Sequence, residues 1–498
     1  MKGMPSPVKT IDTISKANPP GKIYNDTPFE MVNLPPWQHQ SIGGRLIESQ
    51  TGTYLDHDMG TGKTKTAIDA ICNLPSINTA LIFCPAAVVD VWPAEFQKHS
   101  TNAGVVVTPL TGPIRSRVET LEKTLASPPP WSEKLVFITN YEAVQSFGFA
   151  RACHRPWDLV VCDEAHRVKS PGGVRSRRIA KIGSWAKKRL CLSGTPMPHS
   201  PLDIYAQFRF LDQGDEYGTS FARFRARYAI MGGFENRQVL QFINLDDLRE
   251  RFYRVAHSVT KGDVLDLPPV MHVDRLVKLS PAAARIYRDM DQEFYAEVDK
   301  GVVTASNALV KMLRLQQVAC GFVPTDGVWD DPAGTVQTID TAKSEMLAEI
   351  LDELDDSEPI VVFAKFRHDL DQIAQTAESE GRAYFELSGR AKELDAWKTW
   401  PGVCCVTHPP YHPAGAVLGV QIQSGGEGID LTRACYAAYY STGFSMGEYD
   451  QSLARLDRHG QTRPVTYYNI LAEGTIDQKI RKAFTLRRDV INFVLSNR

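Results

Sequence analysis

From Leu34 to about Phe210, short apolar segments of the chain alternate with longer amphipathic segments. The apolar segments are rich in β-branched residues and end in small or polar ones, as in TALIFCP, KLVFITN, WDLVVCDEA and KRLCLSGTP. Buried strands of parallel sheets have this composition, because both faces of the sheet are covered and functional groups gather where the strands end. The pattern therefore predicts an α/β domain over residues 34–210.

A more polar, helical pattern begins at about Leu211. FARFRARY, LDDLRERFYRVAH and SPAAARIYRDMDQEFYAEVD space their apolar residues as helices do and carry many charges. LDLPPV interrupts this pattern, since proline is not tolerated inside a helix. We therefore predict a helical insertion or linker over residues 211–335.

The alternation of strands and helices returns near Thr341. KSEMLAEILDEL and HDLDQIAQTAESEG predict helices, whereas PIVVFAKF and AVLGVQI predict strands. These segments indicate a second α/β domain over residues 336–475, followed by one basic amphipathic helix over 476–498. Residues 1–33 are polar and rich in Pro, Lys and Thr, which fits either an N-terminal arm or a disordered tail.

Composition excludes several classes of protein. Of the 498 residues, 43% are hydrophobic and 23% are charged, which is typical of a globular chain and unlike a disordered, collagen-like or disulfide-scaffold protein. The 56 Lys and Arg residues nearly balance the 58 Asp and Glu residues, so any binding of nucleic acid must use a local basic surface. Nine cysteines without CxxC spacing predict reduced thiols. Because no long apolar segment or apolar leader is present, we expect a soluble intracellular protein without a membrane partner.

The segment LDHDMGTGKTKTA, residues 55–67, predicts a phosphate loop at a strand-to-helix turn. Glycines let backbone N–H groups approach phosphate oxygens, and the helix N-terminus favours the anion. We expect Lys63 to reach the β- and γ-phosphates and Thr64 to hold Mg²⁺. The full pattern has glycine where this chain has His57, and a glycine-rich turn before a surface lysine is the alternative. The loop residues expected to bind the nucleotide are Met59, Gly60, Thr61, Gly62, Lys63 and Thr64.

Two adjacent carboxylates, Asp163 and Glu164, follow the predicted strand WDLVVC. Hydrolysis of a nucleotide needs an acidic partner for the metal and a group that activates or orients water. We expect Asp163 to hold Mg²⁺ and Glu164 to act on the water. In the alternative, the two carboxylates cap a helix.

Together with the phosphate loop, the DEAH segment resembles the ATPases of helicase superfamily two. Further segments resemble its Swi/Snf type, the double-stranded DNA translocases of chromatin remodellers and their bacterial and phage relatives. They are DMGTGKT, LIFCPAAVVDVWPAEFQKH, ITNYEAV, DEAHRVKS, LSGTPMPHSPLDIYAQFRFL, GGEGIDLT and QSLARLDRHGQTRPVTYYNI. The resemblance covers roughly Leu34 to Ile476. It implies two RecA-like lobes with parallel sheets, ATP between them, a helical insertion, and a C-terminal brace helix that packs across the first lobe.

The resemblance assigns further residues to the nucleotide. Catalytic roles in the second lobe fall on Gln451, Arg455 and Arg458 in QSLARLDR, where the guanidinium fork of arginine would stabilise charge on the transferred phosphoryl group. The two arginines are three residues apart and would share a face of a helix, although a solvated basic helix is the alternative. The remaining residues implied to contact ATP are Gln38, Gly428 and Asp430.

Contacts with the DNA backbone are also implied by the resemblance. LSGTP would couple nucleotide state to lobe movement, and GGEGID would touch both DNA and nucleotide. The implied DNA-binding residues are Asn140, Tyr141, Ser193, Thr195, Lys365, Arg367 and Gly425. Two other features are weaker: CCVTHPPYH fits a proline-rich loop better than a zinc site, and KSPGGVRSRRIAKI fits a DNA flank and a solvated helix equally well.

The resemblance predicts an ATP hydrolase that moves along double-stranded or branched DNA as a monomer and displaces DNA-bound proteins. A strand-separating DNA or RNA helicase and a nucleotide-switched DNA-binding module are the alternatives. The chain departs from the family where His257, Ser258 and Val259 precede Thr260, since two arginines are usual there, and where GFSMGEYDQ replaces Trp-Asn-Pro. These variants are similar to phage and bacterial members, so we expect the cytosol of a bacterium or an infected host rather than a nucleus.

Overall fold

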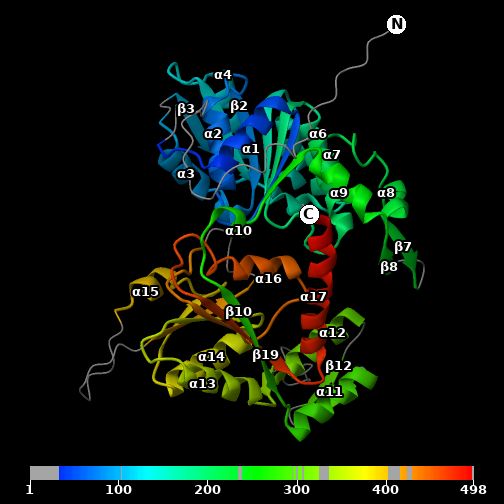
Figure 1. Cartoon of the computed structure of the whole chain (residues 1–498), viewed down its shortest axis with the longest axis vertical. Coiled ribbons are helices and arrows are strands. Elements are labelled where there is room, and N and C mark those ends of the chain that lie inside the picture. Colours follow the sequence, from blue (N-terminus) through cyan, green and yellow to red (C-terminus); the bar gives the residue numbers. More distant parts are fainter. Residues whose placement is uncertain are drawn as a thin grey trace. The chain divides into compact units, whose positions relative to one another are not determined.

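The computed structural model describes residues 33–101, 104–233, 238–293, 295–298, 301–304, 308–324, 336–401, 415–422 and 429–495. These residues form two compact units, each with an α/β architecture (Figure 1). The first unit comprises the described residues of Met1–Gly194 with Gln207–Thr219 and Phe252–Asp266, and the second comprises those of Thr195–Ala206, Ser220–Arg251 and Leu267–Arg498.

A seven-stranded parallel sheet forms the centre of the first unit. In sheet order its strands are β3 (Val105–Pro109), β4 (Lys134–Asn140), β2 (Thr79–Cys84), β5 (Trp157–Asp163), β6 (Ala186–Ser193), β1 (Gly52–His57) and β9 (Ala256–Val259). The register sets Asp56 of β1 opposite Ser193 of β6, and Leu192 of β6 opposite Asp163 of β5. The carboxyl ends of β1, β6 and β5 therefore meet at one end of the sheet.

Helices cover this sheet because each buries an apolar face against it. Apolar side chains of α1, α2 and α3 join those of the strands in one buried cluster, which includes Ile68, Ile71, Ile82 and Val161. The helices of the first unit are α1 (Gln38–Ser49), α2 (Lys63–Asn73), α3 (Val91–His99), α4 (Ile114–Ala126), α5 (Phe147–Cys153), α6 (Val174–Gly183) and α10 (Lys261–Val264), with 3₁₀ turns at Ala86–Val88, Tyr141–Gln145 and Ala165–Val168. Helices α7 (Ile204–Leu211) and α9 (Leu245–Tyr253) have residues in both units.

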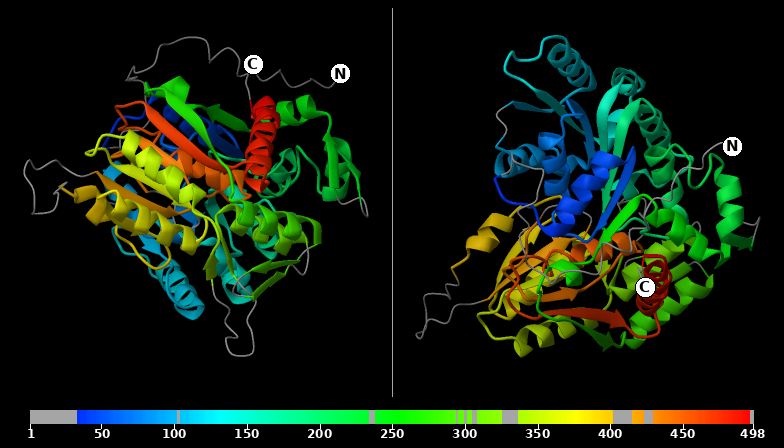
Figure 2. Two further views of the ribbon diagram at one scale, coloured as in Figure 1. Left: turned by 90° about the horizontal axis from the view of Figure 1, so that it is seen from below. Right: turned by 45° about the horizontal axis from the view of Figure 1, so that its top comes forward.

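A six-stranded parallel sheet forms the centre of the second unit. In sheet order its strands are β10 (Val270–Val277), β19 (Val465–Ala472), β18 (Tyr436–Tyr439), β15 (Ile360–Ala364), β17 (Ala416–Gln421) and β16 (Ala383–Leu387). The green strand β10 lies alongside β19, which is distant in sequence (Figure 2).

Helices and three antiparallel hairpins complete the described part of the second unit. The hairpins pair Ala229–Gly232 (β7) with Gln238–Phe242 (β8), Tyr295–Val298 (β11) with Gly301–Thr304 (β12), and Phe322–Pro324 (β13) with Val336–Thr338 (β14). The helices are α8 (Phe221–Tyr228), α11 (Pro281–Glu293), α12 (Ala308–Ala319), α13 (Ala342–Glu353), α14 (Arg367–Ser379), α15 (Leu394–Thr399), α16 (Met446–Leu453) and α17 (Ile476–Leu495), with a 3₁₀ turn at Pro201–Asp203.

The predicted fold class is confirmed, because both units are built on parallel sheets. The apolar segments expected as strands form β2, β4, β5, β6, β15 and β17. The segment 211–335 contains helices α8, α9 and α11 where helices were expected, but α11 ends at Glu293 and YAEV forms β11 instead of continuing the helix. The segment also contains strands β9 and β10, which join the edges of the first and second sheets respectively. Both strands lie at a sheet edge, where fewer neighbouring elements cover the side chains, so AHSV and VMHVDRLV lack the continuous apolar run that marks a central strand. The domain limits stay predictions.

The C-terminal helix α17 begins at Ile476 and buries Ile476, Ile480 and Phe484. It packs on α12 and β19, which belong to the second unit. The expected packing across the first lobe stays a prediction. At its first turn Asp477 forms a buried ion pair of 2.6 Å with Lys343 of α13. None of the helices in the described part of the chain combines the length and apolar composition that a bilayer-spanning segment needs.

Candidate active site

The predicted phosphate loop lies between β1, which ends at His57, and α2, which begins at Lys63. Gly62 immediately before the helix has a φ of 91°, a left-handed conformation that favours glycine. A Cβ on Gly62 would lie 2.2 Å from Nε2 of Gln40, so a larger residue would also collide with α1. The Lys63 ammonium donates hydrogen bonds to the backbone oxygens of His57, at 2.6 Å, and Asp58, at 3.2 Å.

Helix α1 holds the loop from the other side. Nε2 of Gln40 donates to the carbonyl of Thr61 at 3.1 Å, and the same oxygen lies 2.7 Å from Nε2 of His39. Both side chains are buried. Gln38, the residue implied to contact adenine, is the first residue of α1 and is partly exposed. The roles of His39 and Gln40 were not predicted, because a polar pair at the start of a helix looks like ordinary surface.

The predicted acidic pair stands at the end of β5. Asp163 is its last residue and is 8% exposed, and its carboxylate accepts a hydrogen bond of 3.1 Å from the indole of Trp92. Tyr141 is fully buried, and its hydroxyl donates to the backbone oxygen of Asp163 at 2.6 Å. Burial raises the pKa of Tyr141 well above its ordinary value, so this hydroxyl stays protonated as a donor. Trp92 and Tyr141 therefore fix the strand end that carries the acidic pair.

Glu164 has a φ of 51°, which is uncommon for a residue with a side chain and is often found at functional sites. Its carboxylate lies 3.3 Å from Nδ1 of His166, the histidine of the DEAH segment. The same nitrogen lies 3.3 Å from the hydroxyl of Ser193 at the end of β6. His166 thus connects the acidic pair to the LSGTP segment.

Gly194 brings the phosphate loop into this group. A Cβ on Gly194 would lie 3.0 Å from the carbonyl of His57 and 3.3 Å from the ammonium of Lys63. Close contacts therefore run from Lys63 to Glu164 through Gly194, the adjacent Ser193 and His166, at the carboxyl ends of β1, β6 and β5. His166 was not among the residues predicted for the site, and the roles of Lys63 and Glu164 stay predictions.

The donors expected to hold Mg²⁺ are oxygen atoms of Thr64, on the first turn of α2, and Asp163. They fit this ion, which prefers hard oxygen ligands and usually takes one or two protein groups together with phosphate oxygens of the substrate. Among the described residues, no group of three or more His, Cys, Asp or Glu side chains could hold a metal ion by itself. The described cysteines are all free and buried, as expected for reduced thiols.

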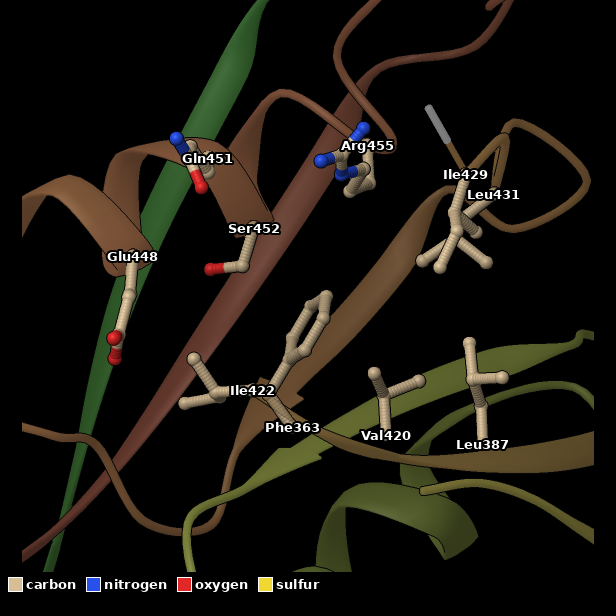
Figure 3. Close-up of a pocket in the computed structure, with 10 residues that line it drawn as sticks. All are labelled: Phe363, Leu387, Val420, Ile422, Ile429, Leu431, Glu448, Gln451, Ser452 and Arg455. Carbon is tan, nitrogen blue, oxygen red and sulfur yellow. The ribbon is translucent and has the colours of Figure 1, made fainter. Parts of the chain in front are cut away.

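The second unit presents Gln451 on α16 and the two arginines just beyond that helix. Helix α16 ends at Leu453, so Arg455 and Arg458 lie in the turns that follow it. The expectation that they share a face of a helix is therefore wrong. Arg455 is 8% exposed and lines a pocket beside Gln451, Glu448 and Ser452. Figure 3 shows Phe363, Leu387, Val420 and Ile422 below these polar side chains, and Ile429 and Leu431 to one side of Arg455.

Arg458 and Asp430 are neighbours in the same unit. Nη1 of Arg458 donates to the backbone oxygen of Ile429 at 3.1 Å. Burial tends to raise the pKa of Asp430, but hydrogen bonds from Thr432 and the charge of Arg458 outweigh it and lower that pKa. Asp430 is therefore ionised at neutral pH. The implied residues Gly425 and Gly428 lie outside the described residues, as do the cysteines and histidines of CCVTHPPYH.

The residues implied to bind DNA are spread over several elements. Asn140, at the end of β4, accepts from Arg117 at 2.5 Å and donates to Glu142 at 2.9 Å. Ser193 is buried in the first unit, and Thr195 begins the part of the chain assigned to the second. The Lys365 ammonium donates to the side chain of Gln316, and burial lowers its pKa, whereas Arg367 at the start of α14 is exposed. Their contacts with DNA stay predictions.

The comparisons with known proteins identify a family. The family model described as the SNF2-related domain matches residues 32–321, more than half of the chain. Protein p41 of Acyrthosiphon pisum secondary endosymbiont phage 1 is 25% identical over 479 residues, which cover 92% of this chain and 97% of that protein.

Two longer relatives match as well. An uncharacterized ATP-dependent helicase of Mycoplasma pneumoniae is 25% identical over 90% of this chain, and the DNA repair and recombination protein RAD54B of Gallus gallus is 23% identical over 94%. The chain spans only 41% and 55% of these two proteins. Among solved structures, the Sulfolobus solfataricus SWI2/SNF2 ATPase core in complex with dsDNA is 21% identical, with 95% of each chain covered and a TM-score of 0.42.

Proposed function

Because the chain belongs to the SNF2-related domain family and is a helicase-like ATPase of the Swi/Snf type, we propose that it is a motor that moves along double-stranded DNA. The observation that carries the proposal is the set of contacts that runs from Lys63 through Gly194, the adjacent Ser193 and His166 to Glu164. This set joins a phosphate-binding cation to a carboxylate that can act on water. It therefore contains the chemical groups that hydrolysis of ATP requires.

Each group has a distinct task in this proposal. Lys63 leaves the two backbone oxygens that now hold it and pairs with the β- and γ-phosphates. Thr64 and Asp163 hold Mg²⁺, which neutralises charge on the phosphates when it is bound. Glu164 orients the attacking water and accepts its proton.

His166 gives the site a route for coupling. Its ring lies within 3.3 Å of both the Glu164 carboxylate and the Ser193 hydroxyl, so movement of either group changes the contacts of the other. Ser193 and Gly194 end the first stretch of the first unit, and Thr195 begins the second unit. We therefore assign to His166 the transmission of nucleotide state to the segment that leaves the first unit.

Arg455 and Arg458 complete the proposal. A guanidinium group stabilises the charge that develops on the transferred phosphoryl group, and a contribution made mainly in the transition state raises turnover rather than affinity. Gln451 and Asp430 position the arginines and the nucleotide, and Gln38 contacts adenine.

Duplex DNA is the proposed track, and the proposed motor is a monomer that displaces DNA-bound proteins in the cytosol of a bacterium or infected host. The phage origin of p41 supports this setting, and the repair and recombination role named for RAD54B supports DNA as the substrate. The name of the mycoplasma relative, an ATP-dependent helicase, favours strand separation as the second candidate.

A pair of substrates separates the two candidates. In the first, a short third strand is wound on an intact duplex, and a translocase displaces it when ATP is present. In the second, a forked duplex reports strand separation. We expect ATP-dependent loss of the third strand and an intact fork. Strand separation on the fork without loss of the third strand would establish the helicase alternative instead.

A further inference from the structure

Two unusual histidines of this chain meet beneath the phosphate loop. His57 occupies the position where the full phosphate-loop pattern has glycine, and His257 lies in the segment just before Thr260 and Lys261. They are 200 residues apart in sequence, yet β9 pairs with β1 and Nε2 of His57 lies 2.9 Å from Nδ1 of His257. We propose that this hydrogen-bonded pair is a positioning device that sets how tightly the loop binds ATP. The inference rests on the proposed nucleotide site.

The pair acts on Lys63 through the backbone. The carbonyl of His57 is the closer of the two oxygens that hold the Lys63 ammonium, at 2.6 Å. The peptide group that contains this carbonyl is held from β9, because the Asp58 N–H donates to the backbone oxygen of Val259 at 2.8 Å, and the side chain of His57 supplies a second anchor. Its ring is 0% exposed, and within the described residues its Nδ1 has no hydrogen-bond partner. The bond to His257 is therefore the anchor of the ring.

A third histidine ties the pair to the rest of the loop. The rings of His39 and His57 are 5.5 Å apart and edge-to-face, and those of His57 and His257 are 5.0 Å apart with similar geometry. His39 also contacts the carbonyl of Thr61 at 2.7 Å. The rings of His39 from α1, His57 from β1 and His257 from β9 thus pack as one group beside the loop. Through this group, the side chain of His257 can affect the conformation of the loop.

The pair is neutral at neutral pH, and this matters for Lys63. Burial, followed by the nearby His257, His39 and Lys63, lowers the pKa of His57 well below its ordinary value. Burial and His39 lower the pKa of His257 to about 4. One neutral ring therefore donates and the other accepts. The pair adds hydrogen bonding without adding a cation that would repel Lys63.

The test compares three single variants and one double variant of the full chain by steady-state ATP hydrolysis with saturating DNA. His257→Leu removes the partner of His57, and we expect the KM for ATP to rise about fivefold, the effect of losing one hydrogen bond, with kcat changed less than about twofold. His257→Asn places an amide near the position of Nδ1, and we expect it to retain most of the wild-type KM. His57→Gly gives the glycine of the full phosphate-loop pattern and removes the side-chain link to His257, while the backbone bond from Asp58 to Val259 remains.

A double-mutant cycle decides whether the two histidines act together. If they do, His57→Gly combined with His257→Leu has the same KM as His57→Gly alone. Three results would each overturn the proposal. The first is that the effects of the two single changes on KM multiply in the double variant. The others are an unchanged KM in His257→Leu and a KM in His257→Asn that rises as much as in His257→Leu. If His257→Leu does not fold, His257→Ala takes its place in the wild-type and His57→Gly backgrounds, where unequal effects on KM support the pair and equal effects overturn it.

Two controls separate this proposal from others. His99→Leu removes a buried histidine of α3 that contacts Glu95, and we expect it to lower thermal stability without raising the KM. Affinity for a fluorescent ATP analogue, measured on each variant, should change in parallel with the KM. Absence of hydrolysis in the wild-type protein would reject the proposed function, whereas normal hydrolysis with an unaffected His257→Leu variant would reject only the histidine pair.

Discussion

At the scale of single residues, Lys63 is the side chain on which the proposed chemistry depends most. Its ammonium is held by two backbone oxygens, and it is placed to exchange them for phosphate oxygens. Lys63→Ala should abolish hydrolysis, because it removes the cation that would pair with the β- and γ-phosphates. Turnover of ATP measures this, with Lys123→Ala, at an exposed lysine of α4, as the control that keeps activity. Normal turnover in Lys63→Ala would show that the loop is not the catalytic site.

Glu164 separates binding of ATP from its hydrolysis. Glu164→Gln keeps the shape of the side chain but loses the base, and Asp163 still holds the metal ion. We expect ATP to bind with nearly normal affinity while turnover falls by about a hundredfold or more. Equilibrium binding and single-turnover hydrolysis measure the two properties. Loss of binding would instead make Glu164 a structural residue or a metal ligand.

Asp56 gives the first unit a pH-dependent stability. It is buried in β1, burial raises its pKa to about 7, and the hydrogen bond of 2.8 Å from Ser258 only partly opposes this. The folded chain therefore holds a proton that the unfolded chain loses above about pH 4. This contribution to stability is present at low pH and is lost as the pH rises to about 7, at about 1.4 kcal/mol per pH unit.

Asp56→Asn removes that titration while keeping an oxygen that can accept from Ser258. The free energy of unfolding of the variant, relative to the wild type, should therefore rise by about 2 kcal/mol between about pH 5 and about pH 8. Denaturant unfolding at the two pH values measures the difference, and the buried histidines titrate in both proteins and cancel. A difference that does not vary with pH would contradict a raised pKa.

At the scale of elements, the ion pair between Lys343 of α13 and Asp477 of α17 fastens the C-terminal helix to the second unit. Both side chains are less than 10% exposed, and the Lys343 ammonium also donates to the carbonyl of Tyr440 at 2.9 Å. Asp477→Asn leaves the lysine charge buried without a carboxylate, and we expect a loss of about 3–5 kcal/mol of unfolding free energy.

Replacing both members of this pair, Lys343→Met with Asp477→Leu, should cost less than the single change, since no buried charge remains. Glu119→Gln, in the exposed pair with Arg115, should change stability little. Denaturant unfolding compares the variants. If the double variant is less stable than Asp477→Asn, the pair does more than balance charge.

Elements also show how far the sequence predicts this protein. The central strands and the helices of both α/β units could be predicted, because burial on two faces leaves an unmistakable apolar run. Strands β9 and β10 could not, since each lies at a sheet edge and keeps polar residues such as His257 and Asp274. The same limit applies to the site. Lys63 and Glu164 follow from local motifs, but the contacts of His39, Gln40 and His257 with the loop arise only when distant strands and helices pack.

At the scale of the whole molecule, the proposal requires the second unit to take part in hydrolysis. Arg458→Ala should leave affinity for ATP and for duplex DNA nearly intact but remove the stimulation of hydrolysis by DNA. An arginine that acts in the transition state can contribute about 10³-fold or more in rate. Basal turnover without DNA should change much less, since DNA binding is what favours the active state.

Basal and DNA-stimulated rates of Arg458→Ala and Arg455→Ala measure this role. Arg463→Ala, an arginine of the same unit that pairs with Glu358, serves as the matched control and should respond to DNA normally. If both Arg455→Ala and Arg458→Ala keep normal stimulation, the first unit hydrolyses ATP without them.

The rate of ATP hydrolysis by the full chain, measured with duplex DNA, single-stranded DNA and RNA in turn, tests the proposed function most directly. We predict that duplex DNA stimulates hydrolysis most. The stimulation should weaken moderately as salt concentration rises, because a chain of net charge −2 can contact few phosphates through a local basic surface. Stimulation by RNA alone, or a rate that no nucleic acid changes, would contradict a motor that moves along double-stranded DNA.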